Sequence, residues 1–138
     1  MEQLLHYVWK HKIFPLSALQ TTSGRPVEVI DPGLPNMNAG PDFFNAKLKI
    51  DGTLWVGNVE VHTQASEWLL HRHDCDKAYD TVILHVVGES NCDVYRTNGE
   101  LVPQMVLTCP DTVRLRYEEL RQTEIYPPCY SILASLPK

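Results

Sequence analysis

The pair Asp51-Gly52 restricts the fold of this chain more than any other feature of the sequence. It separates residues 42–50 from residues 53–63, two segments that we predict to be β-strands. Asp-Gly is a preferred two-residue turn, because glycine adopts a positive φ at the second position without steric cost. We therefore expect an antiparallel hairpin whose strands leave the turn side by side.

The flanking segments predict helices and strands around this hairpin. Apolar residues at helical spacing predict a helix over residues 1–14. A change to helical period predicts a second helix over 65–80, and the apolar run at 81–87 predicts a strand covered on both faces. The other expected elements are a strand at 27–30, a hairpin of 92–97 with 101–109 around Asn98-Gly99, and a helix at 111–122.

This order of elements predicts an α/β fold of the α+β kind. A helix at 65–80 would act as a crossover, which makes the strands on either side of it parallel in a mixed sheet. We expect a mixed central sheet flanked by helices, with an αβββαβ core and a C-terminal β-hairpin and helix. The predicted domain covers residues 1–125, followed by a proline-rich tail or linker at 126–138.

Composition limits the classes of protein to which the chain can belong. Its 138 residues suffice for one core, and 43% apolar with 21% charged residues is typical of a globular protein. The net charge of −5 disfavours a global basic field for nucleic acid, although an acidic metal site beside a local basic groove is compatible with it. We find no membrane span, no secretory signal and no CxxC pair among the four cysteines, so we expect a cytoplasmic protein with reduced thiols.

Three polar side chains share one face of the predicted strand 53–63. Strand side chains alternate, so Asn58, Glu60 and His62 point away from Val59 and Val61. The solvent face of an amphipathic strand accounts for this pattern. A site inside the sheet is the alternative, because the crossover and the following apolar strand place residues 53–63 in the centre.

A second acid favours the site. Asp42 lies nine residues before Asp51, and Glu60 lies eight residues after Gly52, so the two acids meet at the same end of the hairpin. Two adjacent carboxylates raise each other's pKa unless a cation lies between them. Oxygen ligands of this kind suit Mg²⁺ or Mn²⁺.

Pro41-Asp42 followed by Glu60-Val61-His62 resembles the motif of the PD-(D/E)xK nuclease superfamily, with His62 at the position of the usual lysine. The expected element order over roughly residues 1–90 also resembles the restriction-endonuclease-like core of that superfamily. The resemblance implies that Asp42 and Glu60 bind the metal together with the Val61 carbonyl. It implies that His62 holds or activates the attacking water and that nucleic acid is the substrate.

The same resemblance implies an auxiliary acid on the first helix, for which Glu2 is the candidate; Glu28 is a weaker one. Histidine can act as a base near neutral pH but lacks the fixed positive charge of lysine. A catalytically inactive module that binds or serves as a scaffold therefore stays open beside a metal-dependent nuclease.

A second resemblance covers residues 38–62 and 71–87. These segments are similar to the N-terminal part of a family of bacterial proteins with no assigned function, whose members are much longer. The resemblance implies a domain of a larger protein, with a C-terminal region absent from this chain. It supplies no activity, and the oligomeric state stays open.

Another cluster lies at the end of the predicted helix 65–80. The functional interpretation is that His71 or His73, with Asp74, Arg72 or Lys77, approaches a phosphate or a second metal. The plain interpretation is that polar and cationic residues favour a helix C-terminus. On a continuous helix, His71 and His73 would point to different sides.

A zinc hydrolase built from His62, His71, His73 and Asp74 is a third hypothesis, but this spacing matches no zinc motif. We expect His85 to be a hydrogen-bonded core histidine.

The remaining aromatic and basic candidates have plain explanations. Trp55 and Trp68 lie among apolar residues, so we expect both in the core rather than stacked on bases. Lys47 and Lys49 share a strand face that either binds phosphates or is solvated.

Overall fold

The structure is a computed structural model and describes residues 2–12, 19–108 and 115. The chain divides into two compact units, Met1–Thr108 and Cys109–Lys138, and every element named below belongs to the first. The helix predicted at 111–122, the domain boundary at 125 and the tail at 126–138 lie outside the described residues, Leu115 excepted.

The predicted hairpin is confirmed. Strand β3 (Phe43–Ile50) pairs antiparallel with β4 (Thr53–Gln64) across a turn in which Asp51 has φ +53° and Gly52 has φ +80°. Two positive φ values define the turn type that matches the twist of a two-residue hairpin. The turn chemistry therefore sets the register that carries the polar face of β4.

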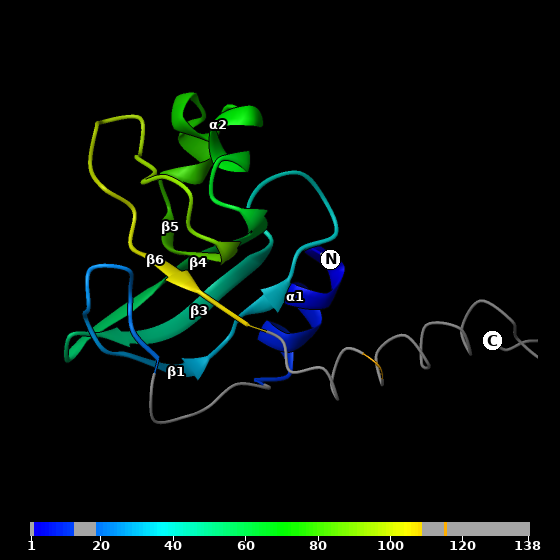
Figure 1. Cartoon of the computed structure of the whole chain (residues 1–138), viewed down its shortest axis with the longest axis vertical. Helices are drawn as coiled ribbons and strands as arrows, with labels where there is room; N and C mark the ends of the chain where they lie inside the picture. Colours follow the sequence, from blue (N-terminus) through cyan, green and yellow to red (C-terminus); the bar gives the residue numbers. More distant parts are fainter. Residues whose placement is uncertain (1, 13–18, 109–114, 116–138) are drawn as a thin grey trace, which may run out of the picture. The chain divides into compact units, whose positions relative to one another are not determined.

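The sheet is mixed, as the crossover predicted, and the fold is α+β. Its path is β1-β3-β4-β5-β6, in which β1 (Val27–Asp31) and β4 flank β3 in antiparallel pairing. Strand β5 (Val82–Glu89) runs parallel to β4, and β6 (Gln104–Val106) runs parallel to β5 (Figure 1). A two-residue strand, β2 (Leu34–Pro35), also pairs with β3.

The continuous helix predicted at 65–80 is wrong. The segment forms a short helix, α2 (Glu67–Leu70), and two 3-10 turns, η1 (His73–Cys75) and η2 (Lys77–Tyr79). Arg72 has φ +60°, which interrupts a right-handed helix, and the Asp76 carboxylate accepts a hydrogen bond from the Ala78 N–H (2.9 Å). The crossover is therefore a series of tight turns.

The second predicted hairpin forms only next to its turn. Its arms share an antiparallel bridge between Tyr95 and Leu101 and two backbone hydrogen bonds, from the Arg96 N–H to the Glu100 carbonyl (2.8 Å) and from the Val102 N–H to the Val94 carbonyl (3.0 Å). Further along, the second arm pairs with β5, where the His85 N–H donates to the Pro103 carbonyl (2.8 Å). Strand β5 is buried over six successive residues, so an inner position in the sheet satisfies its backbone better than an open edge.

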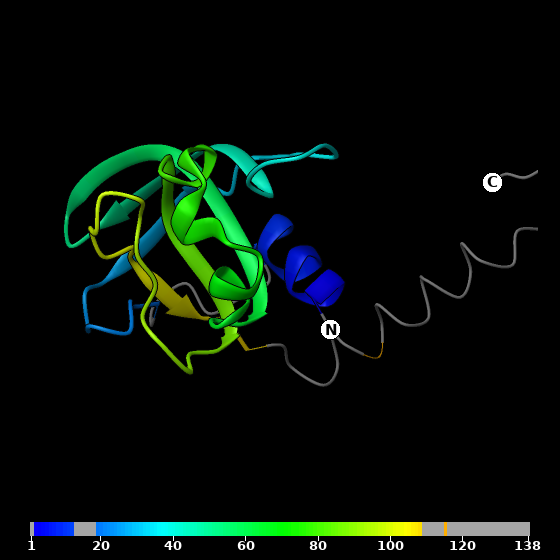
Figure 2. The same ribbon diagram turned by 90° about the horizontal axis from the view of Figure 1, so that it is seen from above.

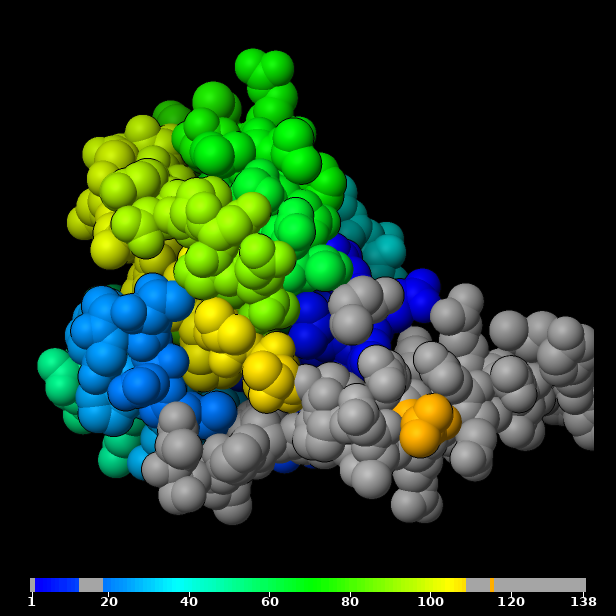
Figure 3. All heavy atoms as spheres, viewed as in Figure 1, coloured from blue at the N-terminus to red at the C-terminus, as the bar shows by residue number. Residues whose placement is uncertain are grey.

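Two groups of side chains cover the sheet and bury the second half of β4. Helix α1 (Glu2–Lys10) confirms the first predicted helix over residues 2–10, whereas His11 and Lys12 form a turn. The helix packs against β4 (Figure 2), and its buried residues are Leu4, Leu5, Val8 and Trp9. Trp68 of α2 and Tyr79 belong to another buried cluster, and the Trp68 Nε1 donates to the Tyr95 carbonyl (3.1 Å). The loop that contains Tyr95 lies beside α2 in the space-filling view (Figure 3). Strand β4 is exposed at its start but fully buried from Val59 to His62.

Candidate functional site

Asp42 and Glu60 interlock at the open end of the β3–β4 hairpin. The Asp42 N–H donates to Glu60 Oε1 (3.0 Å), and the Val61 N–H donates to Asp42 Oδ2 (2.8 Å). The pairing of Phe43 with Val59 produces this arrangement, because it brings Asp42 next to Glu60. The two predicted acids and Val61 therefore lie together, with Asp42 directly before β3 and with Glu60 and Val61 on the neighbouring β4.

Glu60 is the buried centre of the cluster, with 4% of its surface exposed. Its Oε2 lies 3.2 Å from His62 Nε2 and 3.1 Å from His73 Nε2. Burial alone would raise the pKa of Glu60, but hydrogen bonds with His62 and His73 outweigh it and lower the pKa to about 2. Burial likewise would lower the pKa of His62, but the neighbouring Glu60 raises it. Glu60 is thus a carboxylate at neutral pH.

Helix α1 contributes Glu2 and His6 beside Asp42. His6 Nε2 lies 3.3 Å from Asp42 Oδ2 and 3.8 Å from Glu2 Oε2. Burial, together with the charge of Asp42, raises the pKa of Glu2. Burial would lower the pKa of His6, but its contact with Asp42 raises the pKa instead. His6 was not predicted, although its spacing of four residues from Glu2 on a helix places both on one face.

The broken crossover brings two further histidines to the site. One ring nitrogen from each of His62, His71 and His73 lies within 4.8 Å of the other two. His73 is buried and stacks on Tyr79 with ring centroids 3.6 Å apart, whereas His71 is exposed. Burial, with the charge of Glu60, raises the pKa of Tyr79 to about 12, so the phenol stays neutral beside this cluster.

A chain of hydrogen bonds determines which nitrogen of His62 faces Glu60. Gln104 Nε2 donates to the Cys92 carbonyl (3.0 Å), and a carbonyl can only accept, so Gln104 Oε1 must point at His85 Nδ1 (2.9 Å). Burial lowers the pKa of His85 to about 4, which keeps this ring neutral. His85 therefore donates through Nδ1 and accepts through Nε2 from His62 Nδ1 (2.8 Å). His62 Nε2 is left to face Glu60.

The relay through His85 and Gln104 extends the site beyond the residues that sequence analysis singled out. His85 is a buried, hydrogen-bonded histidine as expected. Gln104 carried no signal, because its role depends on the parallel pairing of β6 with β5.

Other candidate residues lie outside the cluster. Asp74 and Lys77 form no hydrogen bond or ion pair with a cluster side chain over residues 2–12 and 19–108, and Glu28 is exposed on β1. Trp68 is fully buried as expected, whereas the core position predicted for Trp55 is wrong, since this side chain is 47% exposed.

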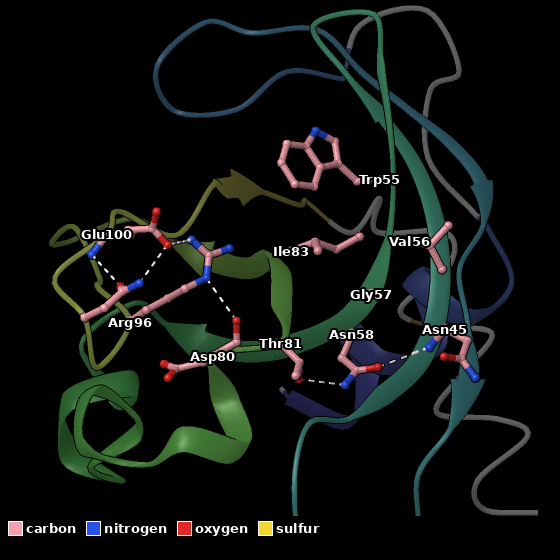
Figure 4. Close-up of a pocket in the computed structure, with 11 residues that line it drawn as sticks. Asn45, Trp55, Val56, Gly57, Asn58, Asp80, Thr81, Ile83, Arg96 and Glu100 are labelled. Carbon is pink, nitrogen blue, oxygen red and sulfur yellow. Dashed lines mark hydrogen bonds and ion pairs between the residues drawn. The ribbon is translucent and has the colours of Figure 1, made fainter.

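Trp55 instead lines a separate surface pocket (Figure 4). The polar side chains there bind one another or the backbone: Asn58 Nδ2 donates to Thr81 Oγ1 (2.8 Å), and Arg96 Nε donates to the Asp80 carbonyl (3.1 Å). None of the predicted metal ligands lines this pocket.

Fold and site define an α+β domain whose mixed sheet buries a cluster of carboxylates and imidazoles. The chain belongs to a protein family described as "Protein of unknown function (DUF2851)", whose family model matches residues 2–138. The predicted membership of an uncharacterised family is therefore confirmed. No curated protein and no solved structure matches the chain. Among the described residues, no helix has the length and apolar character needed to cross a membrane.

Proposed function

We propose that this domain hydrolyses phosphodiester bonds of nucleic acid with a divalent cation, as a relative of the PD-(D/E)xK nucleases. The observation that carries the proposal is the interlocked pair of Asp42 and Glu60, with His62 beside Glu60. The element order supports it as well. Helix α1 precedes β1, β3 and β4, and a crossover leads to the parallel β5, which is the order expected of an αβββαβ core.

The donor atoms fit a hard divalent cation. Each of the two carboxylates uses one oxygen to accept a backbone N–H, which fixes its orientation. Asp42 Oδ1 accepts no hydrogen bond within the described part of the chain, and Glu60 is ionised because its pKa is lowered to about 2. Mg²⁺ or Mn²⁺ prefers such oxygen ligands, and when bound it lowers the pKa of a coordinated water and neutralises charge that develops on the phosphate.

The remaining residues of the site have defined tasks in this proposal. His62 presents Nε2 next to Glu60, where the ring can orient a water molecule and, once Nε2 has lost the proton that it shares with Glu60, accept a proton from that water. Glu2 is the auxiliary acid at the start of α1, and His6 offsets the charge of Asp42. The burial of Glu60 and His62 excludes bulk water and strengthens these interactions.

Cleavage assays test the proposal. The chain, incubated with plasmid DNA and with RNA, should cut at least one of them in Mg²⁺ or Mn²⁺ and neither in EDTA. Asp42→Asn and Glu60→Gln keep the side-chain shapes but remove the charges, so both should lower the rate by roughly 100-fold or more. Glu28→Gln is the matched control, because Glu28 is an exposed acid on β1. Intact DNA and RNA with both cations would contradict the proposal.

A second candidate is a nuclease-fold module that binds nucleic acid without cutting it. It is favoured by His62, which stands where a lysine would supply a fixed charge and whose two ring nitrogens already contact Glu60 and His85. Fluorescence anisotropy with labelled DNA and RNA separates the two candidates. Binding of nucleic acid without cleavage supports the binding module. Absence of both binding and cleavage excludes the binding module and the nuclease alike.

A further inference from the structure

We propose that His62, His71 and His73 form a nitrogen-donor site for a first-row transition-metal cation of the Zn²⁺ class, with Glu60 as fourth ligand. One ring nitrogen of each histidine lies within 4.8 Å of the others. Nitrogens bound to a tetrahedral zinc at about 2.0–2.1 Å are roughly 3.4 Å apart. The three rings therefore need to close by little more than an ångström, which rotation of the exposed His71 can supply.

The carboxylate of Glu60 already lies at ligand spacing from two of the three histidines, and inward rotation of the exposed His71 would bring the third ring to it. Its Oε2 is 3.2 Å from His62 Nε2 and 3.1 Å from His73 Nε2, close to the separation of two ligands on one small cation. Three nitrogens and one carboxylate oxygen complete a four-coordinate set. Asp74, which the sequence spacing grouped with these histidines, is not part of it.

The relay behind His62 prepares this histidine as a ligand. Because Gln104 and His85 are oriented by their hydrogen bonds, the Nδ1 of His62 donates to His85 Nε2 (2.8 Å). In the metal-free chain Nε2 donates to Glu60; a cation that binds here displaces this proton to solvent, and the Nε2 lone pair of the ring then becomes the ligand. Metal-binding histidines commonly donate their second N–H to such an outer partner, which fixes both tautomer and ring orientation.

His73 lacks a partner that a purely structural role would provide. It is 6% exposed, and its Nδ1 is buried with no hydrogen bond to any of the residues described. Because Nδ1 has no partner in this part of the chain, the ring meets Glu60 only through Nε2 (3.1 Å), which is the atom that a cation would bind. A network of Glu60 with two histidines explains these buried contacts, but it does not explain why the exposed His71 also lies beside His62 and His73.

The backbone supports the same arrangement. Arg72 adopts φ +60°, which reverses the chain between His71 and His73 and lets both rings approach His62. Stacking of His73 on Tyr79, at 3.6 Å between ring centroids, holds this ring in place. A non-glycine residue in the left-handed region is unfavourable in isolation, so the surrounding contacts maintain it.

This inference does not depend on the proposed hydrolysis. The histidines can bind a cation whether or not the domain cuts a phosphodiester. Where both hold, His62 is a ligand of this cation, and it no longer serves as the base that accepts a proton from water.

Metal binding without nucleic acid tests the inference. The chain, purified without a histidine tag and stripped by a chelator, is titrated with Zn²⁺ by calorimetry. We expect one Zn²⁺ per chain, retained in a large excess of Mg²⁺. His71→Ala should weaken binding by at least about tenfold, the loss typical of even an outer partner. His71 is exposed, so we expect this variant to fold, which circular dichroism checks, and the exposed His11→Ala is the matched control.

Each outcome of the titration either supports or overturns the proposed histidine site. Absence of Zn²⁺ binding overturns the site. Displacement of Zn²⁺ by Mg²⁺ shows that oxygen donors rather than the histidine nitrogens hold the cation, and equal affinity of His71→Ala and the unaltered chain shows that the cation binds elsewhere; either result also overturns the site. If the chain binds Zn²⁺ as expected but cleaves neither DNA nor RNA, only the proposed hydrolysis is contradicted.

Discussion

Acidification should destabilise the metal-free domain because of His85. This ring is fully buried, donates to Gln104 and accepts from His62, and burial lowers its pKa from 6.5 to about 4. Below pH 6.5 the unfolded chain takes up a proton at this position, while the folded chain does not, so unfolding becomes easier as the pH falls. At about 1.4 kcal/mol per pKa unit, the loss is about 2 kcal/mol at pH 5 and about 3 kcal/mol at pH 4.

The other groups with shifted pKa values change the unfolding free energy mostly outside the range between pH 6.5 and pH 4. The pKa values of His6 and His62 are raised above 6.5, so their contributions are complete below pH 6.5 and are lost only as the pH rises. The lowered pKa of Glu60 removes stability only between pH 4.5 and about 2. The raised pKa of Glu2 acts in the opposite direction near pH 4.5, but its partly exposed side chain keeps that effect small.

Urea unfolding in EDTA at pH 7, 6 and 5 measures the effect. His85→Asn can still donate to Gln104 but does not titrate, and it keeps the contributions of His6 and His62. Between pH 7 and pH 5 the unaltered chain should therefore lose about 2 kcal/mol more of its unfolding free energy than His85→Asn does. The same change in both proteins would refute the reasoning.

Two further predictions concern packing. Gly88→Ala should lower the unfolding free energy by about 1–3 kcal/mol, because a Cβ there would lie 2.9 Å from the Thr63 carbonyl oxygen. Relief of this clash requires a shift of the backbone. An unchanged melting temperature would contradict the prediction. Arg96→Lys should cost about 1–3 kcal/mol in urea unfolding, because lysine cannot reproduce the bonds of Nη2 to the Val82 carbonyl (2.8 Å) and of Nε to the Asp80 carbonyl. An effect below about 0.5 kcal/mol would show that these bonds are not needed.

Local chemistry made the first hairpin and its acids predictable. Asp51-Gly52 specifies the turn, and alternation then places Glu60 and His62 on one face without reference to the rest of the fold. The meeting of Asp42 with Glu60 follows from the same register. The roles of these residues in binding metal stay predictions.

Long-range pairing made the rest of the site unpredictable. His85 and Gln104 reach His62 because β5 and β6 are parallel neighbours, and sequence alternation does not specify the partner of a strand. Turn chemistry alone predicts that the arm that carries Gln104 belongs to a hairpin around Asn98-Gly99. Gly99 does turn the chain, with φ +86°, but Asn98 has no positive φ, and the strand that follows pairs with β5.

The failure of the helix prediction and the convergence of the histidines have one physical cause. On a continuous helix, His71 and His73 would point about 200° apart, so only one of them could face His62. Trp68 and Tyr79 lie in the same buried cluster with ring centroids 6.0 Å apart, whereas eleven residues of regular helix would separate them by about 16 Å along its axis. The left-handed conformation of Arg72 resolves this conflict by ending α2 and reversing the chain. Burial of two aromatic rings thereby outweighs helix propensity, and the histidine cluster is its direct geometric consequence.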